Sequence, residues 1–122
     1  MAKTRHGARG KQPLTPAVLH ILLALADGSK HGYGIMQEVE TISEGRVNMG
    51  PGTLYGSIKR MLAAGLIEET GDRPAPEFDD ERRRYYQLTG LGRGVLTEET
   101  RRLRDLVRVA RRKRLIGEVE GG

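Results

Sequence analysis

The order in which apolar residues change their spacing constrains the fold of this chain most. Three segments with helical spacing come first, and two short strand-favouring segments and a last helical segment follow. In order, they lie at about residues 15–26, 35–42, 51–65, 66–70, 84–88 and 89–115. Apolar side chains three and four positions apart share one helix face, so the helices are expected to bury that face in a common core. A chain of 122 residues has the size of a single domain.

Composition limits the size of the core and indicates the charge of the binding partner. Hydrophobic residues make up 37% of the chain and aromatic residues 4%, so we expect a thin aliphatic core that gains stability by oligomerisation. The net charge of +5 favours an anionic partner, either nucleic acid or an acidic membrane surface. The absence of cysteine excludes disulfides, thiolate zinc sites and cysteine nucleophiles. No apolar stretch is long enough to span a bilayer, and the start of the chain does not resemble a signal peptide, so a cytoplasmic protein is expected.

The third helical segment carries the strongest candidate interface. It starts at Pro51, carries Leu54, Ile58, Met61 and Leu62 at helical spacing, and contains no acidic residue up to Gly65. Its opposite side is small or basic, which suits phosphates and base edges. We predict that Lys59 and Arg60 meet the DNA backbone, that the Tyr55 hydroxyl reaches a phosphate, and that small residues lie near the bases. These small residues are Thr53, Gly56 and Ser57.

The two strand-favouring segments predict a β-hairpin with a long tip. The polar stretch between them, residues 71–83, ends in basic residues that are candidates for DNA contact. The candidates at its end are Arg82, Arg83 and Arg84. Tyr85 and Tyr86 are neighbours on a strand, so one is expected to pack inward and the other to face solvent or a partner.

The last helix has an apolar stripe that needs a partner. Its members recur at three- and four-residue intervals: Leu96, Leu103, Leu106, Val107 and Ala110. We expect a second copy of the chain to cover the stripe, with a stripe folded back on its own domain as the alternative. A basic amphipathic helix can also lie on a membrane, but the stripe lacks aromatic residues, which favours packing.

The two ends of the chain are not expected to join the core. Residues 1–13 are basic and contain no acid, which predicts a flexible arm. Arg5, Arg9 and Lys11 either lie along DNA phosphates or belong to a solvated tail, and both hypotheses stay open. The expected organisation is therefore an arm at 1–13, a DNA-binding domain at 14–89, a dimerisation helix at 90–116 and a disordered tail at 117–122.

The order of elements indicates a winged helix-turn-helix, and three motifs make the indication specific. They are His31-Gly32-Tyr33-Gly34-Ile35, Gly52-Thr53-Leu54-Tyr55 and Arg84-Tyr85-Tyr86-Gln87-Leu88-Thr89. Over about residues 14–94 the chain resembles the PadR family of transcriptional regulators, in its smaller subgroup with one C-terminal dimerisation helix. The fold expected is mainly α with a small β-hairpin.

The resemblance implies a homodimeric regulator, usually a repressor, that binds double-stranded DNA at a pseudopalindromic operator and responds to a small-molecule inducer. The chain departs from the family where Gly90-Leu91-Gly92 follows Thr89 in place of a proline, which predicts a weak start to the last helix. Tyr33 is expected to pack its ring between helices.

Other functions find less support in the residues. A winged-helix module that recruits protein is the main alternative, although acidic residues on the third helix would be expected for it. An enzyme is not expected, because His6, His20 and His31 lack metal-ligand spacing and no Walker-type loop or Ser-His-Asp constellation occurs. No cofactor is predicted.

Overall fold

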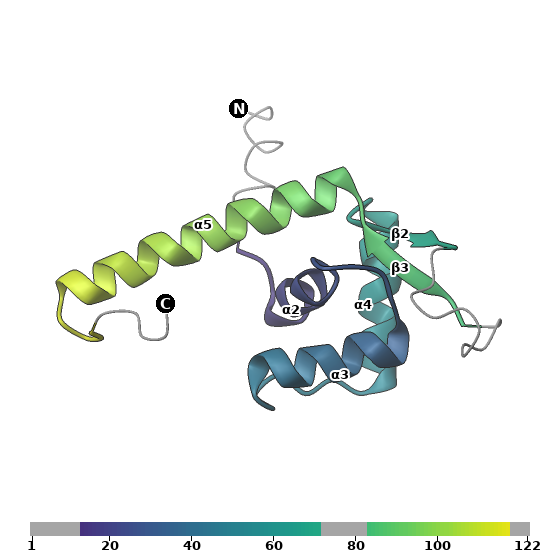
Figure 1. Ribbon diagram of the computed structural model, residues 1–122, viewed down its shortest axis with the longest axis horizontal. Coiled ribbons are helices and arrows are strands. Elements are labelled where there is room, and N and C mark those ends of the chain that lie inside the picture. Colours follow the sequence, from purple (N-terminus) through teal and green to yellow (C-terminus); the bar gives the residue numbers. More distant parts are fainter. Residues whose placement is uncertain (1–12, 72–82, 118–122) are drawn as a thin grey trace.

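The computed structural model describes residues 13–71 and 83–117, which form four α-helices and a three-stranded antiparallel sheet (Figure 1). The elements are α2 (Pro16–Ala24), β1 (Lys30–His31), α3 (Gly32–Ser43), α4 (Pro51–Ala63), β2 (Ile67–Thr70), β3 (Tyr85–Leu88) and α5 (Gly90–Arg112). The predicted fold, mainly α with a small β wing and a long last helix, is confirmed. The last helix ends at Arg112, three residues earlier than expected.

Side-chain caps fix the starts of three helices. Thr15 accepts a hydrogen bond from the Val18 N–H at 3.2 Å, as its place before Pro16 predicts. The His31 ring caps α3 by accepting from the Gly34 N–H at 3.1 Å, and Thr89 caps α5. The fourth helix, α4, begins after Gly50 and Pro51 without a side-chain cap, so its first N–H groups stay available to a ligand.

The core forms around α2, which packs against α3, α4 and α5. Figure 1 shows α2 lying between α3 and α5. Ile21 and Leu22 of this helix, and Leu25 directly after it, are completely or almost completely buried, as expected for a segment that is apolar almost all round. Leu54 from α4 and Ile35 from α3 complete the same cluster.

The sheet contains one strand that the sequence does not predict. β1 is only two residues long and pairs with β3, so the strand order is β1-β3-β2 and β3 is central. The prediction that one of Tyr85 and Tyr86 faces solvent is wrong, because their exposed fractions are 6% and 5%. Tyr86 joins the core, and the ring of His31 packs edge-on against Tyr85 at a centroid distance of 5.2 Å.

The junction between β3 and α5 is closely tied, although the sequence predicts a weak one. The Thr89 hydroxyl donates to the Gly65 carbonyl, its N–H donates to the Leu66 carbonyl at 3.1 Å, and its side chain also caps the Gly92 N–H at 3.0 Å. Gly92 is buried against the Leu66 carbonyl, where a β-carbon would overlap the backbone. Gly92 therefore permits a close approach between α5 and the turn after α4.

The long helix α5 divides into two parts. Its first half packs on the domain, and its second half extends beyond the other helices (Figure 1). Leu96 is 6% exposed and belongs to the core of its own chain. Its assignment to a dimer stripe is therefore wrong, because α2 and β3 already lie against this half of the helix.

Candidate DNA interface

The exposed face of α4 is small and basic. A rotation of about 100° per residue places Gly52, Gly56, Lys59 and Ala63 along one line of the helix. Lys59 is exposed, and Gly56 is half-buried. In the part of the chain that the structure describes, Lys59 forms no salt bridge. This line of small and basic residues can approach a DNA groove closely.

Ser57 does not belong to this face. Its exposed fraction is 1%, and it accepts a hydrogen bond from the Arg60 guanidinium at 3.3 Å. The prediction that Ser57 lies near bases is therefore wrong. The physical reason is its place in the helix, because Ser57 follows Leu54 by three positions and precedes Met61 by four, which puts it on the apolar side. Thr53 and Arg60 are exposed at one border of the basic face.

Tyr55 stands at the other border of that face, where α4 meets α3. Its exposed fraction is 50%, and its hydroxyl lies against Gly32, the first residue of α3. A β-carbon on Gly32 would overlap the phenol, so glycine at this position lets the two helices approach. Tyr55 thus lies half-exposed between the basic face of α4 and the start of α3.

A pocket of about 520 Å³ lies beside Tyr55, where α3, α4 and β3 meet. Its lining residues are His31, Gly32, Tyr33, Tyr55, Arg83, Arg84 and Tyr86. Tyr33 is 56% exposed, so the prediction that its ring packs between helices is wrong; the residue lines the pocket instead. The sequence gives no signal for this pocket, because its walls come from three separate segments.

Charges of both signs surround the pocket. Arg84 pairs with Glu69 at 3.3 Å, and the Arg83 guanidinium lies 2.9 Å from Nε2 of His31. Both arginines are exposed and directly precede β3. Burial raises the pKa of the Tyr86 phenol, and Glu69 and Tyr55 add to the rise. The pocket thus combines two guanidinium groups with phenol hydroxyls.

Four other predicted DNA contacts lie outside the described residues: Arg82, Arg5, Arg9 and Lys11. Of the predicted interface, the structure brings Tyr55 from α4 and the two arginines that precede β3, Arg83 and Arg84, to the same pocket.

The predicted dimerisation residues other than Leu96 lie on the second half of α5. Leu106 is 53% exposed and Val107 38% exposed, whereas Leu103 and Ala110 are half-buried. At 100° per residue, Leu103, Leu106 and Ala110 continue the helix face that Leu96 buries in the domain. The apolar face of α5 thus continues beyond the part of the helix that packs on the domain.

Glu99 lies between the half of α5 that packs on the domain and the half that extends beyond it, and it has a role that the sequence does not predict. It is 5% exposed, binds the Arg102 guanidinium through both carboxylate oxygens at 2.8 and 3.1 Å, and accepts from the Leu14 N–H at 3.3 Å. The hydrogen bonds from Arg102 and from the Leu14 N–H hold the pKa of the Glu99 carboxyl below its ordinary value. The i,i+3 spacing to Arg102 is a sequence signal for the ion pair, but the bond to Leu14 has none.

Within residues 13–71 and 83–117, no group of three His, Cys, Asp or Glu side chains is placed to hold a metal ion. No helix in these ranges has the length and apolar character needed to cross a membrane.

Comparison with known proteins identifies the family. Residues 21–98 match the model of the transcriptional regulator PadR-like family. The chain is 38% identical over 90 residues to the transcriptional regulator Rv3488 of Mycobacterium tuberculosis, covering 74% of this chain and 78% of that protein. It is 41% identical over 83 residues, or 68% of this chain, to an uncharacterized 37.1 kDa protein in transposon TN4556 of Streptomyces fradiae, of whose length it spans only 21%.

Solved structures share the fold. A PadR family transcription regulator from Clostridium difficile superimposes with a TM-score of 0.64 at 24% identity, covering 80% of this chain and 97% of that one. Bacillus subtilis PadR in complex with operator DNA gives a TM-score of 0.59 at 20% identity, over 71% of this chain and 47% of that one. With the family model matching more than half of its length, the chain belongs to the PadR-like family of transcriptional regulators.

Proposed function

We propose that this regulator is a cytoplasmic homodimer that represses transcription by binding a pseudopalindromic operator, with one α4 per subunit in adjacent major grooves. The observation that carries the proposal is the exposed face of α4, which is free of acid, narrow along Gly52 and Gly56, and basic at Lys59 and Arg60. A helix of this kind fits a major groove and meets phosphates at its rims. Bacillus subtilis PadR, which shares the fold, has been solved with operator DNA.

In this proposal, the size of each side chain decides whether it contacts phosphates or bases. Lys59 and Arg60 contact phosphates, which contribute most of the affinity and little of the specificity. Thr53 and Gly56 stand nearest the bases, so readout depends on close approach and on the shape of the DNA. Arg83 and Arg84 extend the phosphate contacts to the base of the wing.

The proposed dimer contact is the second half of α5. Leu106, Val107 and the half-buried Leu103 form an apolar surface that no residue of the described chain covers completely. A second copy would cover it with the same surface, as a twofold contact requires. The dimer would set the spacing between the two α4 helices and hence the spacing of the operator half-sites.

Response to a small-molecule inducer is the remaining part of the proposal. Binding in or beside the dimer contact would change the spacing of the two α4 helices and release the operator. A thermal-shift panel of phenolic acids, dyes and antibiotics, followed by operator titration with each compound that shifts the midpoint, tests this part. If no compound both raises the midpoint and weakens operator binding, the inducer is not of these classes.

The decisive experiment for DNA binding is a fluorescence anisotropy titration of the protein's own promoter region and a scrambled duplex, at two salt concentrations. We expect a preference of about a thousandfold for the promoter. If about eight phosphates are neutralised, log affinity falls against log salt with a slope of about −7. Weak, equal binding to both duplexes that disappears with salt would instead favour a protein-recruitment module.

A double variant locates the interface. Lys59→Ala with Arg60→Ala should weaken binding to every duplex and make the salt slope less steep by about 2, because each lost phosphate contact removes about 1. The matched control is Arg101→Ala with Arg112→Ala, which removes the same charge from exposed positions on α5. Equal losses in both double variants would mean that only net charge matters, and would remove α4 from the model.

A further inference from the structure

We propose that the pocket between α3, α4 and β3 is a seat for one backbone phosphate of the bound DNA, and that the hydroxyl of Tyr86 forms its inner wall. The proposal rests on the DNA-binding function proposed above and names a contact for it that lies outside α4. It assigns roles to Tyr86 and to the first turn of α3 that neither the sequence nor the family match supplies.

The buried Tyr86 hydroxyl is the first observation. Tyr86 is 95% buried, since its exposed fraction is 5%, yet it lines the pocket. Among the described residues its hydroxyl has no hydrogen-bond partner. Buried hydroxyl groups are almost always paired, because leaving one unpaired costs free energy. A hydroxyl kept unpaired at the wall of a pocket indicates a bond that forms with a ligand.

The start of α3 is the second observation. This helix has 12 residues, and its His31 cap accepts from the Gly34 N–H, so the N–H groups of Gly32 and Tyr33 are not bonded to the cap. Free N–H groups and the positive end of the helix dipole favour an anion. Gly32 lines the pocket and has no side chain to cover its backbone.

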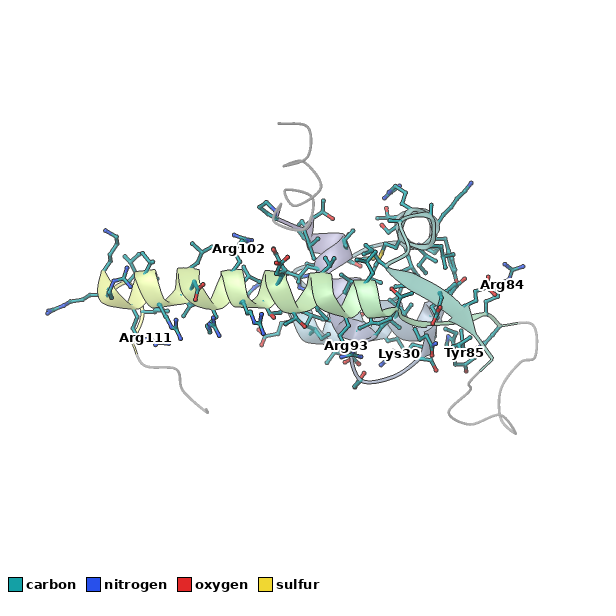
Figure 2. The ribbon with its side chains drawn as sticks, turned by 90° about the horizontal axis from the view of Figure 1, so that it is seen from above. Lys30, Arg84, Tyr85, Arg93, Arg102 and Arg111 are labelled. Carbon is teal, nitrogen blue, oxygen red and sulfur yellow. The ribbon has the colours of Figure 1, made fainter. Side chains whose placement is uncertain are left out.

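The charges of the pocket select a phosphate over a neutral group. Arg83 and Arg84, which directly precede β3, line it. Figure 2 shows Arg84 and Tyr85 on opposite sides of the strand. The pair between Arg84 and Glu69 is exposed, at 72% and 50% of the two side chains, so little free energy holds it and the guanidinium can turn to a phosphate. A phosphate accepts from guanidinium, hydroxyl and backbone N–H groups alike.

The position of the pocket favours DNA as the source of that phosphate. Tyr55 belongs both to the pocket and to the border of the α4 face, so a duplex lying on α4 passes the mouth of the pocket. The pocket also opens beside the arginines at the base of the wing. One phosphate bound here would fix the rotation of the domain about the axis of α4. The contacts of Lys59 and Arg60 alone do not determine this rotation.

The test compares Tyr86→Phe with Tyr85→Phe. Each removes one oxygen from a buried ring on the same strand, but Tyr85 does not line this pocket. We expect Tyr86→Phe to weaken promoter binding about tenfold, the usual effect of losing a hydrogen bond to a charged group. Its melting temperature should stay the same or rise, because the hydroxyl is unpaired without DNA. Tyr85→Phe should leave the affinity unchanged.

A duplex series with single neutral methylphosphonates then locates the phosphate. At one position per half-site, the methylphosphonate should weaken binding of the wild-type protein. At the same position it should not weaken binding of Tyr86→Phe any further. Equal affinities of Tyr86→Phe and wild type, or equal losses in both tyrosine variants, would overturn the phosphate seat and leave the proposed DNA binding intact.

A second readout holds even if the promoter is not bound. In amide NMR spectra, inorganic phosphate should shift the Gly32 and Tyr33 resonances selectively, and Tyr86→Phe should reduce the shift. If the protein prefers no duplex but these resonances move, the pocket binds phosphate, but the phosphate belongs to a free phosphate ester. The proposed function then fails. If they do not move and no duplex is preferred, both proposals fail.

Discussion

The two halves of α5 carry similar apolar patterns but meet different surroundings. In the first half, Gly92, Leu96 and Glu99 are buried against α2, the turn after α4 and the start of the described chain. In the second half, Leu106 and Val107 continue a similar pattern into solvent. Spacing therefore defines which face of a helix is apolar, whereas tertiary structure decides what covers it. Substitutions in the first and second halves of α5 should therefore have different effects.

The largest effect is expected in the first half, from Leu96→Ala. Removing a buried leucine side chain should lower the free energy of unfolding by about 2–5 kcal/mol. Urea unfolding at several protein concentrations measures it, and the loss should be the same at each concentration. For comparison, Leu106→Ala should mainly reduce the dependence of stability on concentration. The reverse pattern would mean that the roles of the two halves are exchanged.

A somewhat smaller effect is expected from Gly92→Ala. The added β-carbon would overlap the Leu66 carbonyl, and forced repacking typically costs about 1–3 kcal/mol. Gly94→Ala is the matched control, because Gly94 lies on the same helix with no atom near its β position. That control should stabilise the protein by about 0.5–1 kcal/mol through its helix propensity. Similar melting temperatures for the two variants would contradict the close junction.

In the second half, Leu106→Arg should change assembly and leave folding intact. Exposed substitutions usually alter stability by no more than about 0.5 kcal/mol, but a charge in an apolar contact separates the subunits. Light scattering after size exclusion should show a monomer with unchanged helical content. Thr97→Arg, about two and a half turns before Leu106 and on the opposite face of the helix, should remain a dimer. A dimeric Leu106→Arg variant would place the subunit contact elsewhere.

The smallest effect concerns the boundary between the halves and depends on pH. The folded-state pKa of Glu99 is lowered, so its stabilising contribution is complete above the unfolded value of about 4.3 and is lost as the pH falls through the folded value. Melting temperatures between neutral and acidic pH should therefore fall less steeply for Glu99→Gln than for the wild type. Parallel curves would show that Glu99 does not contribute.

Local signals in the sequence predict local features well. The cap at Thr15, the start of α4 at Pro51 and the acid-free face with Lys59 and Arg60 all follow from neighbouring residues. Ser57 could have been placed correctly from its spacing to Leu54. These features depend on positions within about one turn of each other.

Features made by distant segments could not be predicted. Strand β1 has two residues and no pattern of its own, yet it makes β3 central and covers Tyr85. Gly92 matters because of Leu66, and Glu99 because of Leu14. The pocket around Tyr86 needs α3, α4 and β3 together. None of these pairings leaves a periodic signal in the sequence.

The measurement that tests the central claim most directly is the stoichiometry of the promoter complex by sedimentation velocity. The account predicts two chains of 13.5 kDa per promoter duplex for the wild type. For Leu106→Arg, it predicts weakened binding with single chains adding independently. One wild-type chain per duplex, or an unchanged cooperative pair in Leu106→Arg, would contradict a dimer that is held by α5 and binds DNA through α4.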